Sequence, residues 1–134
     1  MPGFADPFYG NVPRKMTVSE LVRALRMNVA AEEEATALYE AHADATDNPI
    51  ARKVLLDVAN EERVHVGEFI RLIDILTDGE EKAWMDNGYA EVDELAEEVM
   101  AGDTEPVTPQ AKAAEEDSSP GGADEATTIG SLKE

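Results

Sequence analysis

The apolar residues of this chain fall into two long stretches with helical spacing. Between residues 17 and 43 they recur in alternating steps of four and three, and the same spacing returns between residues 49 and 76. The first stripe consists of Leu21, Leu25, Asn28, Glu32, Ala35, Tyr39 and His42. The second consists of Ala51, Leu55, Val58, Glu62, His65, Phe69, Leu72 and Leu76. This pattern predicts two amphipathic helices that each pack through one face.

Local signals at the helix ends support a hairpin. Thr17 and Glu20 have the spacing of a capping box, which starts a helix. Residues 44–49 then form a polar turn in which Asn48 can cap the second helix and Pro49 takes its first position. The sequence therefore predicts an all-α fold built on an antiparallel two-helix hairpin.

A third, shorter helix is predicted after the hairpin. Residues 77–81 interrupt the second helix, and apolar residues then return with helical spacing at Trp84, Val92, Leu95 and Val99. We expect a kink at Asn87 and Gly88, an end at Gly102, and packing outside the hairpin. Residues 1–16 contain several prolines and glycines and are expected to form an irregular arm whose aromatic residues could pack on a neighbour. Those aromatic residues are Phe4, Phe8 and Tyr9.

Three ionisable residues occupy positions in the apolar stripes. They are Glu32 on the first helix and Glu62 and His65, one turn apart, on the second. A buried carboxylate without a partner costs several kcal/mol, and the usual compensation is a counter-charge or a metal ion. At about 1.5 Å per residue, all three lie roughly 20 to 28 Å from a turn centred near Thr46. The carboxylate and imidazole set suits iron, manganese or zinc.

The neighbouring polar residues have other interpretations. A single polar residue in a stripe often only fixes the register of packing, and Glu32 alone could do that. His42 lies about 15 Å along the helix from Glu32, so we expect it to be structural or to face solvent. Tyr39 could be simple core or could donate a hydrogen bond into a metal site.

The chain encodes half of a two-metal centre. Four-helix proteins that hold two metal ions between carboxylates use one Glu from each of two helices and a Glu-x-x-His from each of the other two. This sequence has one of each, Glu32 and the pair Glu62 and His65. A complete centre therefore requires two copies of the hairpin, and we expect a homodimer or a multiple of dimers.

Composition excludes several function classes. The chain has 134 residues and a net charge of −19, which disfavours nucleic acids and anionic membranes and favours cations. It has no cysteine, so disulfides and thiolate sites are excluded. No apolar run approaches the roughly 20 residues needed to cross a bilayer, and the start has no signal-peptide pattern. We expect a cytoplasmic protein with no membrane or nucleic-acid partner.

The sequence changes character after Gly102. Residues 103–126 are rich in Pro, Gly, Ser, Ala and acidic residues, which is typical of a disordered linker. Apolar residues return only in residues 127–134, where Ile129 and Leu132 flank Gly130 and Ser131. This segment is either a frayed terminus or, as we expect, a short peptide that docks into a groove.

These motifs resemble those of a known family. The hairpin from Glu32 through Tyr39 to Glu62 and His65 resembles the encapsulated ferritin-like proteins. Residues 129–133 resemble the cargo-loading peptide that directs such proteins into encapsulin nanocompartments. The resemblance implies a half-ferritin domain over residues 17–102 that dimerisation completes to a four-helix bundle. It also implies a ring of dimers, a di-iron ferroxidase centre at each dimer interface, and iron storage inside an encapsulin shell.

The resemblance also suggests roles for individual residues. It implies that Glu32, Glu62 and His65 are iron ligands, that Tyr39 lies just behind them, and that Glu34 lies on the path by which metal reaches the site. Residues 129–132, Ile129, Gly130, Ser131 and Leu132, would contact the shell protein. Ala31 departs from the family, which often has an acidic residue at that position.

Alternative functions remain open from the sequence. The chain could be a rubrerythrin-like peroxidase, or a flavin-binding ferritin-like cargo in which the aromatic arm and Trp84 stack on the flavin. A non-enzymatic interaction module, whose polar stripe only sets the pairing, is the third hypothesis. The sequence does not determine the ring size, the native oxidant, or the roles of Tyr39 and the arm.

Overall fold

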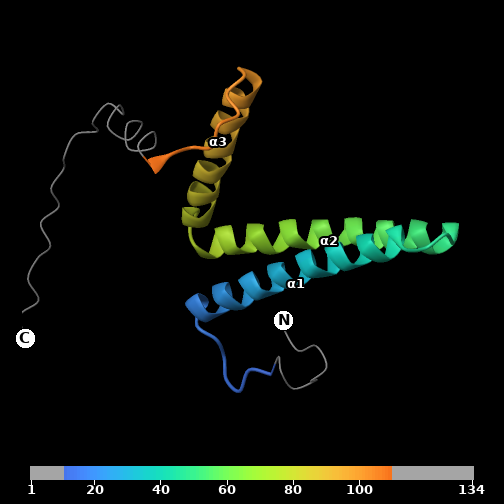
Figure 1. Ribbon diagram of the computed structural model, residues 1–134. Helices are drawn as coiled ribbons and strands as arrows, with labels where there is room; N and C mark the ends of the chain where they lie inside the picture. The colour runs from blue at the N-terminus through green and yellow to red at the C-terminus, as the bar shows by residue number, and fades with distance from the viewer. Residues whose placement is uncertain (1–10, 110–134) are drawn as a thin grey trace, which may run out of the picture. The chain divides into compact units, whose positions relative to one another are not determined.

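The described part of the protein, residues 11–109 of a computed structural model, is helical (Figure 1). Its three helices are α1 (Val18–Asp44), α2 (Pro49–Leu76) and α3 (Glu80–Met100), and residues 11–109 contain no strand. The prediction of an all-α fold with a hairpin and a third helix is confirmed. No helix in this described span has the length and apolar content that a membrane crossing requires.

The start of α1 is fixed by the predicted capping box. Thr17 Oγ1 accepts a hydrogen bond from the Glu20 backbone N–H at 3.2 Å, and Glu20 Oε2 accepts one from the Thr17 N–H at 2.8 Å. Arg14 also binds the Glu20 carboxylate, at 2.6 Å. Glu20 is therefore held by a backbone donor and a guanidinium, and these interactions lower its pKa to about 2.

The turn between α1 and α2 also follows its sequence signals. Asn48 Oδ1 accepts hydrogen bonds from the backbone N–H groups of Ile50 and Ala51, both at 3.0 Å, and Pro49 takes the first helical position. Arg52 donates to the carbonyl of Ala43 at 2.9 Å and so satisfies a free acceptor at the end of α1. These contacts reverse the chain and make α1 and α2 antiparallel.

A turn with left-handed backbone separates α2 from α3. Asp78 has φ 52° and Gly79 has φ 84°, and both helices end or begin beside this pair. The start of α3 is held by Asp74, whose Oδ1 accepts the Lys82 backbone N–H at 3.3 Å. Gly102, with φ 100°, follows the end of α3 as expected. The helix runs without interruption through Asn87 and Gly88, where a kink was expected.

The packed core of the hairpin is small. Val22, Leu25 and Ile73 are buried near its open end, and partly buried apolar side chains surround them at Leu21, Val29, Phe69 and Leu76. Toward the turn the buried residues are small, since Ala43 and Ala59 are each 0% exposed. Each large buried side chain contributes roughly 1.5 to 3 kcal/mol. This core is modest for a chain of this length, and association would extend it.

The predicted stripes are shifted relative to the buried face. On α1, Asn28 and His42 are exposed, while Thr36 is buried. On α2, Ala59 and Ile73 are buried instead of Val58 and Leu72. The reason is that each helix has two neighbouring stripes of mostly uncharged residues, and the hairpin buries only one of them. The expectation that His42 faces solvent is confirmed.

The third helix contributes no buried residue to the described structure. Its expected apolar positions are all exposed: Trp84, Val92, Leu95 and Val99. The chain divides into two compact units, one ending at Val92 and the other beginning at Asp93. Residues 1–10 and 110–134 lie outside the described residues, and with them most of the expected arm and linker and all of the expected docking peptide.

Candidate metal centre

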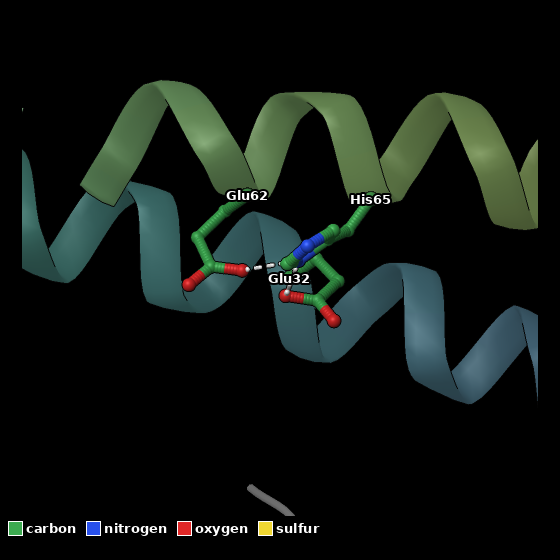
Figure 2. A group of neighbouring side chains, drawn as sticks. All are labelled: Glu32, Glu62 and His65. Atoms are coloured by element: carbon green, nitrogen blue, oxygen red, sulfur yellow. Dashed lines mark hydrogen bonds and ion pairs between the residues drawn. The ribbon is translucent and has the colours of Figure 1, made fainter. Parts of the chain in front are cut away.

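The hairpin brings Glu32, Glu62 and His65 together. Glu32 lies in the middle of α1, and Glu62 and His65 lie one turn apart on α2, with all three side chains directed toward one another (Figure 2). One ligand atom from each residue lies within 4.8 Å of the other two. His65 Nδ1 is 3.0 Å from Glu62 Oε2 and 3.8 Å from Glu32 Oε2. Within residues 11–109 this is the only group of three acidic or histidine side chains with such a spacing.

The site is covered on the carboxylate side and open on the imidazole side. The side chains of Glu32 and Glu62 are 23% and 15% exposed, whereas that of His65 is 47% exposed. The buried stripe of α2 runs through Ala59 and Ile73 and faces α1. His65 lies at the edge of this stripe, so α1 covers it only in part. A single hairpin therefore holds the two carboxylates in place and leaves an edge of the imidazole accessible.

The pKa values of the three groups depend on one another. Hydrogen bonding to Glu62 raises the pKa of Glu32, with burial adding to the effect. Hydrogen bonds to Glu32 and His65 lower the pKa of Glu62, and the hydrogen bond to Glu62 raises that of His65. Neither carboxylate pairs with a lysine or arginine in the described part of the chain. His65 is thus the one basic side chain beside the two carboxylates among the described residues.

The donor set fits a transition metal. Two carboxylate oxygens and one imidazole nitrogen suit iron, manganese or zinc, and three ligands from one chain leave coordination positions free. Nδ1 is the nitrogen of His65 that faces the carboxylates, so metal binding requires the imidazole proton to reside on Nε2.

Tyr39 and Glu34 have no direct link to this group in the structure. Tyr39 is half-buried two turns after Glu32, and Glu34 is exposed. Among residues 11–109, no hydrogen bond or ion pair joins either residue to Glu32, Glu62 or His65. The roles suggested for them stay predictions. Ile129, Gly130, Ser131 and Leu132 lie outside the described residues.

Thr36 lies beside Glu32 on the buried face of α1, at a position that the sequence pattern did not indicate. This residue is 6% exposed and lies one turn after Glu32, and its hydroxyl donates to the Glu32 backbone carbonyl at 2.9 Å. It occupies the buried face of α1, where the predicted stripe had Ala35 instead. The signal that could have identified it is the i, i+4 spacing from Glu32, which places both on one helix face.

Between Leu21 and His42, a second stripe of α1 lies beside Glu32 and contains no Asp, Glu, Lys or Arg. By helix geometry its members are Leu21, Ala24, Met27, Asn28, Ala31, Ala35, Leu38, Tyr39 and His42. Because the helices are antiparallel, this stripe and His65 lie on the same side of the hairpin. Met27 and Leu38 are 59% and 50% exposed. An exposed, uncharged stripe beside the open side of the site is typical of an association surface.

Two curated proteins are similar to this chain. The encapsulin nanocompartment cargo protein EncC of Myxococcus xanthus is 52% identical over 68 residues, which cover 51% of this chain and 52% of that protein. A ferritin-like–encapsulin shell fusion protein of Pyrococcus furiosus is 40% identical over 90 residues, which cover 67% of this chain and 26% of that protein. The chain thus spans about half the length of the first relative and about a quarter of the second.

A solved structure shares the fold. The crystal structure of the encapsulated ferritin domain from Pyrococcus furiosus matches with a TM-score of 0.61 and 41% sequence identity, over 67% of this chain and 91% of that chain. A family model described as Rubrerythrin matches residues 23–128, which include all three residues of the candidate centre. Since this match covers most of the sequence, the chain belongs to the rubrerythrin family of ferritin-like proteins.

Proposed function

We propose that the protein is a ferroxidase that oxidises Fe(II) to Fe(III) at a di-iron centre formed between two copies of the chain. The observation that carries the proposal is the group of three donor atoms within 4.8 Å of one another, in which neither carboxylate has a lysine or arginine partner among the described residues. Family membership supports iron as the metal. Fe(II) is the substrate, and dioxygen is the proposed electron acceptor.

Two copies are needed because one hairpin supplies half of the ligands. A four-helix di-iron site takes one Glu from each of two helices and a Glu-x-x-His from each of the other two. The uncharged stripe of α1 and the open edge of His65 lie on one side of the hairpin, so a second copy placed there would contribute the missing half. A twofold axis between the copies would repeat Glu32, Glu62 and His65.

The residues of each copy have distinct tasks in this proposal. Glu32, Glu62 and His65 would hold the iron, and bound iron would supply the one-electron chemistry. The carboxylates favour the harder Fe(III) product over Fe(II). Hydrogen bonding to Glu62 raises the pKa of Glu32 and of His65, so any proton that these two ligands carry must leave when the metal binds. The apolar side chains of the association surface would exclude water from the completed site.

We further propose that the protein works inside an encapsulin compartment. The Myxococcus relative is named as an encapsulin cargo protein, and the Pyrococcus relative is a fusion to an encapsulin shell. In this chain residues 127–134 are the expected cargo-loading peptide, with Ile129 and Leu132 as the apolar contacts. A hairpin dimer encloses no storage cavity of its own, so the oxidised iron would accumulate within the shell.

The test measures Fe(II) oxidation by the full chain and by Glu32→Gln, Glu62→Gln and His65→Ala. We expect each change to slow oxidation by at least about tenfold, since each removes a ligand from both halves of the centre. Glu33→Gln is the matched control, because Glu33 is an exposed carboxylate next to Glu32. Wild-type rates in all three ligand variants, with helical content unchanged, would refute the proposal.

Further assays of the same purified protein distinguish the alternative functions. Faster turnover with hydrogen peroxide than with dioxygen would favour a rubrerythrin-like peroxidase, and visible absorption typical of flavin would favour a flavin-binding cargo. A purified protein that binds neither iron nor another transition metal would favour an interaction module. The peroxidase alternative has its own support in the family match.

A further inference from the structure

A groove lies on the side of α2 that faces away from the uncharged stripe of α1. Its volume is about 410 Å³, and it is formed by α2 and the first turns of α3. Its apolar lining comes from Ile70, Met85 and Tyr89, and Gly67 leaves open space where a side chain would stand. All of these residues belong to the unit that ends at Val92.

The charges around the groove cancel one another. Arg71 binds Asp74, and Lys82 binds Asp86, and all four side chains line the groove. In a chain with a net charge of −19, this is a locally neutral site with an apolar floor. An occupant should therefore be aromatic or aliphatic and carry little charge of its own.

We propose that residues 1–10 of the same chain occupy this groove through Phe4, Phe8 and Tyr9. These ten residues hold three of the seven aromatic residues of the chain and a single charged side chain, Asp6. By contrast, residues 110–134 are mainly acidic and small and have only Ile129 and Leu132 as large apolar side chains. The aromatic segment is thus the part of the chain outside the described residues whose chemistry matches the groove. Its aromatic rings suit the Met85 thioether and the Tyr89 ring.

The point of attachment makes this docking possible within one chain. Leu25 packs with Ile73, and Arg26 binds Glu81 at 2.6 Å, so the beginning of α1 lies beside the end of α2 and the start of α3. The groove is at that same end. Ten residues span at most about 33 to 36 Å when extended, and residues 11–17 add further chain before α1 begins. Pro2 and Pro7 limit the conformations of the free segment and so reduce the entropy lost on docking.

Thiol cross-linking tests the proposal, because the chain has no cysteine. The test variant is Ala5→Cys with Gly67→Cys, which keeps all three aromatic residues and places a small side chain in open space at the groove. The matched control pairs Ala5→Cys with Lys53→Cys. Lys53 is exposed on the same side of α2, about 21 Å closer to the turn. A short bifunctional thiol reagent is added to the full-length protein, and mass spectrometry separates cross-links within one chain from those between chains.

We expect cross-linking within one chain to be at least about fivefold faster for the Gly67 pair than for the Lys53 pair. The reason is that docking would raise the effective concentration of residue 5 at the groove. Replacing Phe4, Phe8 and Tyr9 by Ala in the Gly67 pair should remove this excess. Equal rates for the two pairs, or an excess that survives loss of the aromatic residues, would overturn the proposal. Covalent dimers in an equal mixture of the two single-cysteine chains, without intrachain product in the double variant, would assign the groove to a second copy and overturn it as well. None of these outcomes depends on iron.

Discussion

At the scale of single residues, the hydrogen bonding within the metal centre predicts how metal binding depends on pH. The pKa of His65 is raised by its hydrogen bond to Glu62, and the pKa of Glu32 is raised by its hydrogen bond to Glu62. Both groups therefore bind protons more tightly in the metal-free protein than they would alone. Because metal must displace those protons, affinity should rise as pH increases from about 6 to 8, and binding should release protons.

Calorimetric titration with Zn²⁺ in buffers of different ionisation enthalpy measures this release without redox chemistry. In His65→Ala the dependence above pH 6 should flatten, because no imidazole proton has to be displaced by the metal. An affinity that stays constant between pH 6 and 8 in the unchanged protein would contradict the assignment of His65 as a ligand.

Loss of a ligand should not destabilise the metal-free fold. Glu32 and Glu62 are two carboxylates at close range without a lysine or arginine partner in the described chain. Glu32→Gln removes one ionisable group of this pair, so the thermal midpoint of the metal-free protein should stay the same or rise by a few degrees. The metal-loaded protein should show the reverse, a lower midpoint for Glu32→Gln. A fall in the metal-free midpoint would mean that Glu32 is a structural residue.

At the scale of elements, the capping box at the start of α1 predicts an acid-sensitive contribution to stability. Glu20 has its pKa lowered to about 2, from an ordinary value of 4.5, first by Arg14 and then by the Thr17 N–H. A lowered pKa means that the contribution is fully present above pH 4.5 and is lost as pH falls toward 2. Glu20→Gln should therefore be less stable than the unchanged protein at pH 6, and the two should converge near pH 2.

Urea denaturation at both pH values measures this difference. Thr17→Ala gives a comparison from the same box, since it removes an uncharged cap worth about 1 kcal/mol. The stability that Thr17→Ala loses should be similar at pH 6 and near pH 2. A Glu20→Gln deficit that does not shrink in acid would show that the carboxylate charge is not what stabilises the helix start.

The elements also show what sequence reasoning could and could not establish. The helix limits were predictable because their signals are local: the Thr17 cap, the Asn48 cap with Pro49, and the glycines after α2 and α3. The face that each helix buries was not predictable. Each helix has two adjoining stripes of mostly uncharged residues, and only the packing of α1 against α2 determines which stripe is buried. Thr36 was missed for that reason. Glu32 and Glu62 lie at the boundary of the stripes, so their convergence could be predicted despite the shift.

At the scale of the whole molecule, the uncharged stripe of α1 predicts the dimer. Ala35→Arg places a long cation in the middle of this stripe, and it should prevent dimerisation and reduce Fe(II) oxidation by at least about tenfold. Ala37→Arg is the matched control, since the same substitution two residues later lies on the exposed opposite side of α1. Sedimentation analysis with and without Fe(II) measures the assembly. A dimeric, active Ala35→Arg protein would show that the copies meet on another surface.

The C-terminal segment gives the second prediction for the whole molecule. A chain truncated after Ala126 lacks Ile129 and Leu132, and it should no longer be packaged when it is co-expressed with an encapsulin shell. Two such side chains contribute roughly 3 to 6 kcal/mol before the cost of ordering, so one peptide binds weakly and several tethered copies bind well. Fe(II) oxidation by the truncated chain should remain unchanged. Equal packaging of the two chains would refute this assignment of the tail.

The half-open imidazole of His65 has a consequence for where in a cell iron would be oxidised. If two chains must meet to complete the centre, activity at low concentration grows with the square of the chain concentration. A newly made, dilute chain would therefore oxidise little iron in open solution. Confinement of many copies in a small volume would drive pairing without any added effector. Packaging would then act as the activating step, and insoluble ferric product would form mainly where a container is present to receive it.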